Sequence, residues 1–285
     1  DYWCGFFAYH YAVTQNSGDN ASTFQSSTTY SSYLRVDELL SLQTPLSDNP
    51  EHDELLFIVI HQSYELWFKS ILHEMARAQE LLIQGLTHPV LAALGRVRTI
   101  LKVLVGQVDI LETMTPLQFN TFRDRLEAAS GFQSGQFREI EAVLGRRDSS
   151  MVAHYSPTSV MHKRISSAMS RPSLWDSVLR YLELRSHHIP REILNRDVSA
   201  PHAAHDEVQQ ALIAAYRNDP EAALLLERLV DIDEGLQEWR YRHVKMVERT
   251  IGMKMGTGGS SGAKYLIDTL FNPVFPDLWN VRVQF

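Results

Sequence analysis

Between about residue 227 and residue 251, apolar residues recur with the spacing of one helix face. This stripe predicts a long amphipathic helix. Its members recur at steps of three and four residues: Leu229, Ile232, Leu236, Trp239, His243, Met246 and Thr250. Charged residues of the same segment, Asp233 among them, fall mostly on other faces. Gly252 directly after the stripe predicts the helix end. His243 therefore lies where a leucine would normally face the core.

A second stripe predicts another long helix from about residue 53 to residue 83. Its members are Phe57, His61, Tyr64, Phe68, Ile71, Met75, Ala78 and Leu82. A single histidine on an apolar face is most often a core residue with a hydrogen-bond partner. Two such histidines, His61 and His243, also fit a second interpretation. One would bind the metal of a buried planar cofactor, and the other would lie on its distal side.

The other helical patterns extend the same architecture over most of the chain. They cover about residues 91–111, 135–144, 173–184, 206–217 and 263–270, and Thr115 with Pro116 is a typical helix start. Residues 146–172 are of mixed character, and no strand-like alternation extends beyond a few residues. The sequence predicts an all-α protein with a single helical-bundle domain, residues 30–285. An extended N-terminal arm, residues 1–29, would precede it and could contact a neighbouring subunit.

The composition excludes several classes of partner and metal site and predicts the cellular compartment. With 27 Lys and Arg residues against 34 Asp and Glu residues, the net charge of −7 argues against a nucleic-acid partner. No apolar run approaches the ~20 residues needed to cross a bilayer, and the opening residues lack signal-peptide architecture. Cys4 is the one cysteine. We therefore expect a reducing cytoplasm, and we exclude intrachain disulfides, Cys-based zinc or iron–sulfur sites and thioether-linked haem.

Three polar features each have a structural and a functional interpretation. Arg123, flanked by aromatic residues, either packs its stem with a solvated head or binds a carboxylate through its planar guanidinium fork. The glycine-rich stretch Gly256–Gly262 is either a flexible linker or a lid, in which the Thr257 hydroxyl could meet a polar ligand. His202 and His205 have a metal-binding spacing, but no third type of ligand lies near them in the sequence.

Several collinear motifs together resemble the tryptophan 2,3-dioxygenase family, from about Tyr30 to Val283. They are Tyr30-x-x-Tyr33-Leu34, the runs His52–Trp67 and Leu111–Pro116, Phe122-Arg123-Asp124, and the runs Ser130–Gln133, Trp239–His243 and Gly256–Gly262. The resemblance implies an all-helical fold with non-covalent haem b between core helices and O2 as co-substrate. It also implies a homotetramer in which an N-terminal segment of one subunit helps complete its neighbour's active site.

The resemblance also implies a role for each candidate residue. His243 matches the proximal ligand of the haem iron, and His61 matches the distal, catalytic histidine beside the substrate indole. Phe57 matches an aromatic wall, Arg123 the clamp on the substrate carboxylate, and Thr257 the contact with the amino-acid head group. The other pocket positions are Tyr30, Tyr33, Phe119, Leu126, Ser130 and Gly131.

The activity that the resemblance implies is cleavage of the indole C2–C3 bond of L-tryptophan, or a close analogue, with O2. The product would be N-formylkynurenine, formed in tryptophan catabolism through the kynurenine pathway. The two residues between Tyr30 and Tyr33 are Ser31 and Ser32, where the family usually has at least one glycine, and the residues before Tyr30 also differ from the family. These departures keep open a haem-dependent monooxygenase of a substituted tryptophan in a natural-product pathway. A haem sensor or carrier without turnover agrees less well with Arg123, because a sensor needs no amino-acid clamp.

Overall fold

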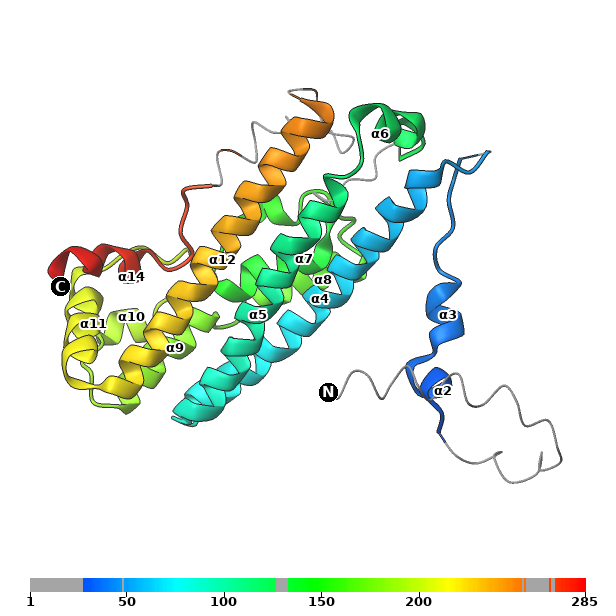
Figure 1. Ribbon diagram of the computed structural model, residues 1–285. Helices are drawn as coiled ribbons and strands as arrows, with labels where there is room; N and C mark the ends of the chain where they lie inside the picture. Colours follow the sequence, from blue (N-terminus) through cyan, green and yellow to red (C-terminus); the bar gives the residue numbers. More distant parts are fainter. Residues whose placement is uncertain (1–27, 48, 127–132, 253, 255–266, 268–269) are drawn as a thin grey trace, which may run out of the picture. The chain divides into compact units, whose positions relative to one another are not determined.

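Helices α4 (His52–Ile83), α5 (Thr87–Leu111) and α12 (Pro220–Ile251) run side by side in the computed structural model, with α5 packed against both others (Figure 1). The structure describes residues 28–47, 49–126, 133–252, 254, 267 and 270–285. The buried Tyr64 joins two of the long helices, since its hydroxyl donates to the carbonyl oxygen of Leu104 at 2.8 Å. Burial raises the pKa of Tyr64 to about 12, so this hydroxyl remains protonated and able to donate.

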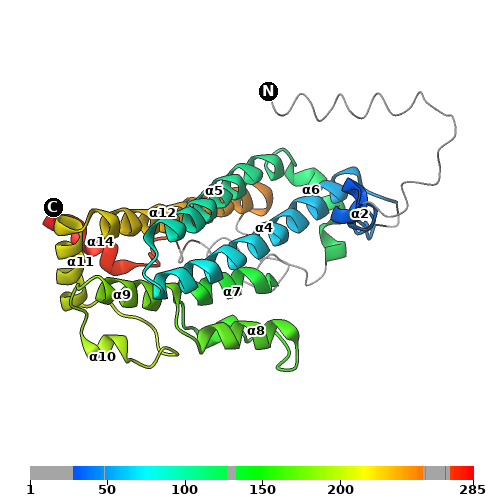
Figure 2. The ribbon, with the colours of Figure 1, turned by 90° about the horizontal axis from the view of Figure 1, so that it is seen from below.

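Shorter helices lie along one side of the long ones and at their ends (Figure 2). In chain order these elements are α6 (Pro116–Arg123), a 3-10 turn (Asp124–Leu126), α7 (Gly135–Leu144), a 3-10 turn (Ser149–Met151), α8 (Val160–Met169), α9 (Leu174–Leu184), α10 (Arg191–Leu194), α11 (Asp206–Asn218), α14 (Pro276–Asn280) and a 3-10 turn (Val281–Gln284). Helices α7 and α9 pack on α4, and α8 lies on the outer side of α7 (Figure 2). No described residue belongs to a β-strand, which confirms the predicted all-α class.

The ends of α12 follow from its sequence. Asp219 caps the start by accepting from the backbone N–H of Ala222, and Pro220 occupies the first helical position, where no donor is needed. The predicted end is confirmed at Gly252, whose φ of 64° is costly for a residue with a β-carbon. The helix begins earlier than the stripe suggested, so it is long enough to carry both core residues and His243.

Asp233 on α12 is fully buried, although the charged residues of its segment fall mostly on faces other than the apolar stripe. One of its carboxylate oxygens accepts from the backbone N–H groups of Val274 and Phe275 and from the indole N–H of Trp279, at 2.9–3.0 Å. These donors make a buried carboxylate tolerable. They also fasten the segment before α14 to the middle of α12.

The chain divides into two compact units, Asp1–Thr44 and Pro45–Phe285. In the first unit the structure describes α2 (Tyr30–Leu34) and α3 (Val36–Leu40), neither of which buries a residue. Of the predicted arm, residues 1–27 lie outside the described residues, so its extent and its boundary at residue 30 stay predictions. Among the helices that the structure describes, none is long and apolar enough to cross a membrane.

Three helices of the second unit were not predicted. Helix α8 lies in the segment of mixed character, α10 lies between residues 187 and 205, where no helix was expected, and α14 lies in the tail after residue 270. Most of the helix expected at residues 263–270 falls outside the described residues. His202 and His205 do not pair on a helix, because α11 begins only at Asp206. Instead, the His202 ring and the backbone N–H of His205 both bond the buried carboxylate of Asp277, each at 2.9 Å.

Candidate functional site

His61 lies one turn after Phe57 on α4, and the local geometry fixes its tautomer. Its Nδ1 is 2.7 Å from the carbonyl oxygen of Phe57, and a carbonyl can only accept, so Nδ1 carries the proton. Burial lowers the pKa of His61, although the Phe57 carbonyl and the Glu65 carboxylate oppose this. The ring is therefore neutral at pH 7, and its Nε2 is left as an acceptor.

His243 lies on α12 in a still less polar environment. Burial is the main cause that lowers its pKa to about 4, and the charge of a protonated His61 lowers it further. The two imidazoles come from different helices, α4 and α12, and each keeps part of its surface accessible. The structure thus holds one neutral imidazole on each of the two helices that the sequence singled out.

Aromatic rings form a wall beside His61. The ring centroid of Phe57 lies 4.1 Å from that of His61 and 5.8 Å from that of Phe119. Phe122 completes the group, with centroids 5.7 Å from Phe57 and 5.4 Å from Phe119 in edge-on arrangements. Both of these phenylalanines come from α6, which starts at a capping box between Thr115 and Gln118. The wall can hold a flat apolar group next to the acceptor of His61.

Arg123 is the last residue of α6, directly after the buried Phe122, and its side chain is half-buried. Leu126, at the end of the following 3-10 turn, is also half-buried. The predicted pocket residues Ser130, Gly131 and Thr257 lie outside the described residues. The structure therefore places Arg123 on the helix of the aromatic wall, and its predicted contact with a carboxylate stays a prediction.

Tyr30 and Tyr33 lie on α2 in the first unit, and both side chains are exposed. The unexpected Ser32 between them has a local role. Thr29 caps α2 by accepting from the Ser32 N–H, and the Ser32 hydroxyl oxygen accepts from the Thr29 N–H at 2.9 Å. Glycine has no side chain for this reciprocal bond, so the departure at residue 32 is explained by helix capping.

Trp239 is a site residue that pattern reasoning placed only among core positions. Its ring stacks on His243 with an interplanar angle of 2° and a centroid distance of 5.4 Å. Its other aromatic neighbours include Phe137 on α7, at a centroid distance of 4.8 Å, and Phe68 and Tyr64 on α4, each at 6.3 Å. The spacing of four residues between Trp239 and His243 was the available signal, since such residues share a helix face.

The donor set constrains any metal at this site. Within the described residues, no three His, Cys, Asp or Glu side chains are grouped so that they could hold a metal ion. A single neutral imidazole leaves most coordination positions of a metal unfilled. His243 therefore fits a metal that brings other ligands of its own, as the iron of a haem does, better than a bare ion.

Comparison with known proteins gives one consistent result. The tryptophan 2,3-dioxygenase family description matches residues 14–192 and 200–285. A tryptophan 2,3-dioxygenase of Anaeromyxobacter sp. is 59% identical over 261 residues, which cover 92% of this chain and 97% of that protein. Another from Herpetosiphon aurantiacus is 58% identical, covering 90% of this chain and 98% of its own. One from Bacillus thuringiensis subsp. konkukian is 44% identical, covering 92% and 94% respectively.

Proposed function

The chain belongs to the tryptophan 2,3-dioxygenase family, and from this we propose that it cleaves the indole C2–C3 bond of L-tryptophan, or a close analogue, with O2. The product is N-formylkynurenine, because both oxygen atoms of O2 are inserted across the bond that breaks. The proposal includes a place in tryptophan catabolism through the kynurenine pathway. The single cysteine supports a cytoplasmic location.

One observation carries this proposal beyond the family name. Two half-buried imidazoles, His61 and His243, remain neutral on separate helices, and an aromatic wall lies beside one of them. Neutral imidazole is the form of histidine that binds a metal. We infer that His243 holds the iron of a non-covalent haem b and that His61 lies on the open side. When bound, the haem supplies the iron that binds O2.

The aromatic wall and His61 would bind the indole ring of the substrate. Phe57 and Phe119 would pack against the indole ring and exclude water. His61 would accept the indole N–H through its Nε2, since its Nδ1 proton is already donated to a carbonyl. Its role would be orientation of the indole, without an obligatory proton transfer.

The amino-acid end of the substrate needs polar partners. Arg123 at the end of α6 would bind the carboxylate through its planar fork, and Thr257 would contact the head group. The remaining proposed pocket positions are Tyr30, Tyr33, Leu126, Ser130 and Gly131. Holding the head group fixes the indole over the reacting centre, which is how binding at a distance accelerates the reaction.

We further propose a homotetramer in which an N-terminal segment of one subunit completes the site of its neighbour. The first unit supports this, because α2 and α3 bury no residue of their own. Tyr30, Tyr33 and Leu40 are each more than 60% exposed. Apolar side chains exposed together in this way are typical of a surface that another chain covers.

The deciding experiment follows the oxygen atoms. The haem-loaded, reduced protein is mixed under anaerobic conditions with L-tryptophan, then with 18O2, and the product is analysed by mass spectrometry. Two labelled atoms in a ring-opened product support the proposal. One labelled atom in a product that keeps both indole rings would instead identify a monooxygenase, and absence of any product would contradict an oxygenase.

A further inference from the structure

Glu65 on α4 is a charged residue close to the candidate site, and the proposed function assigns it no role. It lies one helix turn after His61, so the two side chains share a face of α4. The residue is half-buried, and α7 packs on this part of the second unit. A carboxylate held at this position acts through its charge on the imidazole one turn away.

Two side chains from the start of α7 hold the Glu65 carboxylate in place. The Ser134 hydroxyl donates to one carboxylate oxygen at 2.5 Å, and the Gln136 amide donates to the other at 2.8 Å. The same amide also donates to the backbone carbonyl oxygen of Glu65, at 2.8 Å. Ser134 is the N-cap of α7 and accepts from the backbone N–H of Phe137. The negative charge therefore lies at the positive end of the α7 dipole, with a donor on each oxygen.

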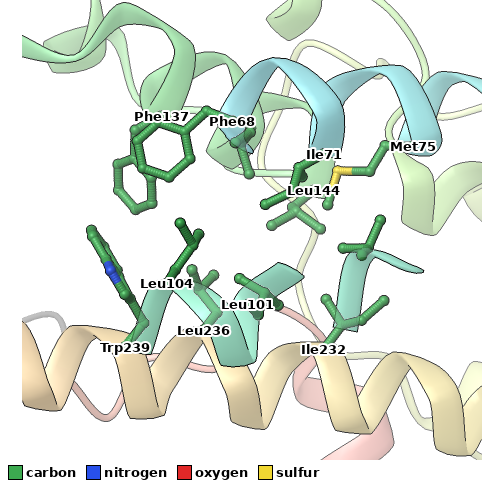
Figure 3. Close-up of a pocket in the computed structure, with 12 residues that line it drawn as sticks. Phe68, Ile71, Met75, Leu101, Leu104, Phe137, Leu144, Ile232, Leu236 and Trp239 are labelled. Carbon is green, nitrogen blue, oxygen red and sulfur yellow. The ribbon is translucent and has the colours of Figure 1, made fainter. Parts of the chain in front are cut away.

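The donors are fixed in turn, because the first turn of α7 packs into the core. The ring centroid of Phe137 lies 4.8 Å from that of Trp239 on α12 and 5.5 Å from that of Phe68 on α4. In the close-up, Phe137 and Trp239 lie near each other at one end of a group of core side chains (Figure 3). The position of the Glu65 carboxylate thus depends on a helix that aromatic packing keeps in place.

The cations around Glu65 leave its charge unpaired. Lys69 on α4 and Arg164 on α8 line the open groove beside it, between α4, α7 and α8. Arg164 is paired with Glu139 at 2.6 Å. Within the described residues, neither cation forms an ion pair with Glu65. Its carboxylate is therefore stabilised by neutral donors and keeps its effect on other groups.

His61 responds to this charge. Burial lowers the pKa of His61, whereas the carbonyl of Phe57 and the carboxylate of Glu65 both act to raise it. His243, the other imidazole of the site, is neutral at pH 7 and adds no charge. A nearby negative charge makes the unprotonated Nε2 of His61 more basic, and a more basic nitrogen accepts a hydrogen bond more strongly.

We propose that Glu65 is a positioning residue of the candidate site, whose carboxylate, held by the start of α7, makes His61 a stronger acceptor for the indole N–H of the substrate. The inference rests on the proposed function, because this N–H belongs to the proposed substrate. Glu65 itself does not touch the substrate in this scheme and acts only through His61.

Three substitutions separate the charge of Glu65 from its place in the fold. Glu65→Gln removes the charge and keeps the length, and the new amide can accept from Gln136 and donate to the Ser134 hydroxyl oxygen. Glu65→Asp keeps the charge on a shorter side chain. Glu80→Gln is the matched control, because it removes a carboxylate from an exposed pair with Arg77 further along α4.

The first measurement is an NMR titration of His61 in the haem-free protein, with its signal assigned from His61→Ala. We expect the pKa of His61 to fall further in Glu65→Gln and to stay near the parental value in Glu65→Asp and Glu80→Gln. A His61 that titrates alike in the parent and in Glu65→Gln would overturn the proposal. An equal fall in Glu65→Asp would overturn it too, because the charge would then not be the cause.

The second measurement compares kcat/KM for tryptophan and for 1-methyltryptophan, which has no indole N–H. We expect Glu65→Gln to lower the value for tryptophan by at most about tenfold, the contribution of one neutral hydrogen bond, and to leave 1-methyltryptophan nearly unaffected. Glu80→Gln should change neither. Equal fractional losses for the two substrates would overturn the action through the indole N–H. If the parent forms no oxygenated product at all, the proposed function fails, while the titration of His61 still tests the effect of Glu65.

Discussion

The indole of Trp239 stacks on the imidazole of His243, with ring planes within 2° and centroids 5.4 Å apart. The tryptophan is held in turn by Phe137 on α7, at a centroid distance of 4.8 Å. One face of His243 is therefore covered by a ring that packing from another helix keeps in place. This covering contributes to the burial that lowers the pKa of His243 to about 4.

The first prediction concerns this stack. Trp239→Ala removes the ring that covers His243 and leaves a cavity, so it should lower the free energy of unfolding by roughly 3 kcal/mol. It should also raise the pKa of His243 towards its ordinary value of 6.5, since burial is the main cause of the shift. Denaturant unfolding and NMR titration of the haem-free protein measure the two effects. Trp239→Phe keeps a stacked ring and should change both less; equal effects of the two variants would refute the covering role.

A second prediction concerns acid stability at the start of α12. Hydrogen bonds from Arg185, at 2.6 and 2.7 Å, are the main cause that lowers the pKa of Asp219 well below its ordinary value of 3.8. A carboxylate with a lowered folded-state pKa stabilises the fold above its unfolded pKa and loses that contribution as pH falls through the folded one. Asp219→Asn should therefore cost about 1–3 kcal/mol at pH 7.

The difference between parent and Asp219→Asn should shrink below about pH 4, because the carboxylate of the unfolded parent then takes up a proton while that of the folded parent stays ionised. Denaturant unfolding at pH 7 and at pH 3 measures it. Asp206→Asn is the control, since Asp206 is an exposed residue in the first turn of α11. A difference that stays constant down to pH 3 would show that charge at residue 219 is not the cause.

The features of the fold that could be predicted are those that depend on the periodicity of apolar residues within one helix. A stripe at steps of three and four is a property of one helix, so the sequence places His61 and His243 on the apolar faces of their helices, and in the structure both side chains are half-buried. Helix α8 escaped prediction because it buries only Ile165 and Ala168, which is too short a stripe to detect. The burial of Asp233 could not be predicted either, since its three donors come from the segment at residues 274–279.

In the candidate site too, contacts within one helix could be predicted from the sequence, and contacts between helices could not. The contact of Phe57 with His61 follows from their spacing of four residues, and so does the stack of Trp239 on His243. The packing of Phe137 against Trp239 depends on how α7 and α12 are placed relative to each other. This placement could not be predicted from the sequence pattern of either helix. Pocket roles such as that of Arg123 came from the family resemblance, and they stay predictions.

A third prediction tests the charge of the substrate. If Arg123 binds the carboxylate through its fork, Arg123→Lys should not restore function, because a lysine ammonium cannot make the bidentate contact. The fall in kcat/KM for tryptophan should correspond to a loss of about 2–5 kcal/mol of transition-state stabilisation. Arg77→Lys, in an exposed pair with Glu80, is the matched control and should behave as the parent. Tryptamine lacks the carboxylate and should be a poor substrate, so equal turnover of tryptamine and tryptophan by the parent would exclude the clamp.

A fourth prediction concerns the free acceptor of His61. Because its Nδ1 proton is donated to the Phe57 carbonyl, its Nε2 can accept the indole N–H of the substrate. His61→Ala should lower turnover of tryptophan, with haem content unchanged. The loss should be smaller for 1-methyltryptophan, which has no N–H to donate. Steady-state rates for both substrates measure this, and an identical fractional loss would mean that His61 does not read the indole nitrogen.

The fifth prediction concerns the iron ligand. His243→Ala removes the one imidazole of α12, so stable haem binding should be lost while helical content remains. Absorption spectra of the reconstituted protein and far-UV circular dichroism measure the two properties. His73→Ala is the control, because His73 is an exposed histidine on α4 and should keep full haem content.

Added imidazole separates loss of a ligand from loss of the fold. A small imidazole can enter the space left by His243→Ala and bind the iron in place of the side chain, so it should restore haem binding in a concentration-dependent way. Restoration requires that the surrounding packing, including Trp239, has survived. A His243→Ala protein that retains full haem and an unchanged spectrum without imidazole would show that the iron is held by another residue.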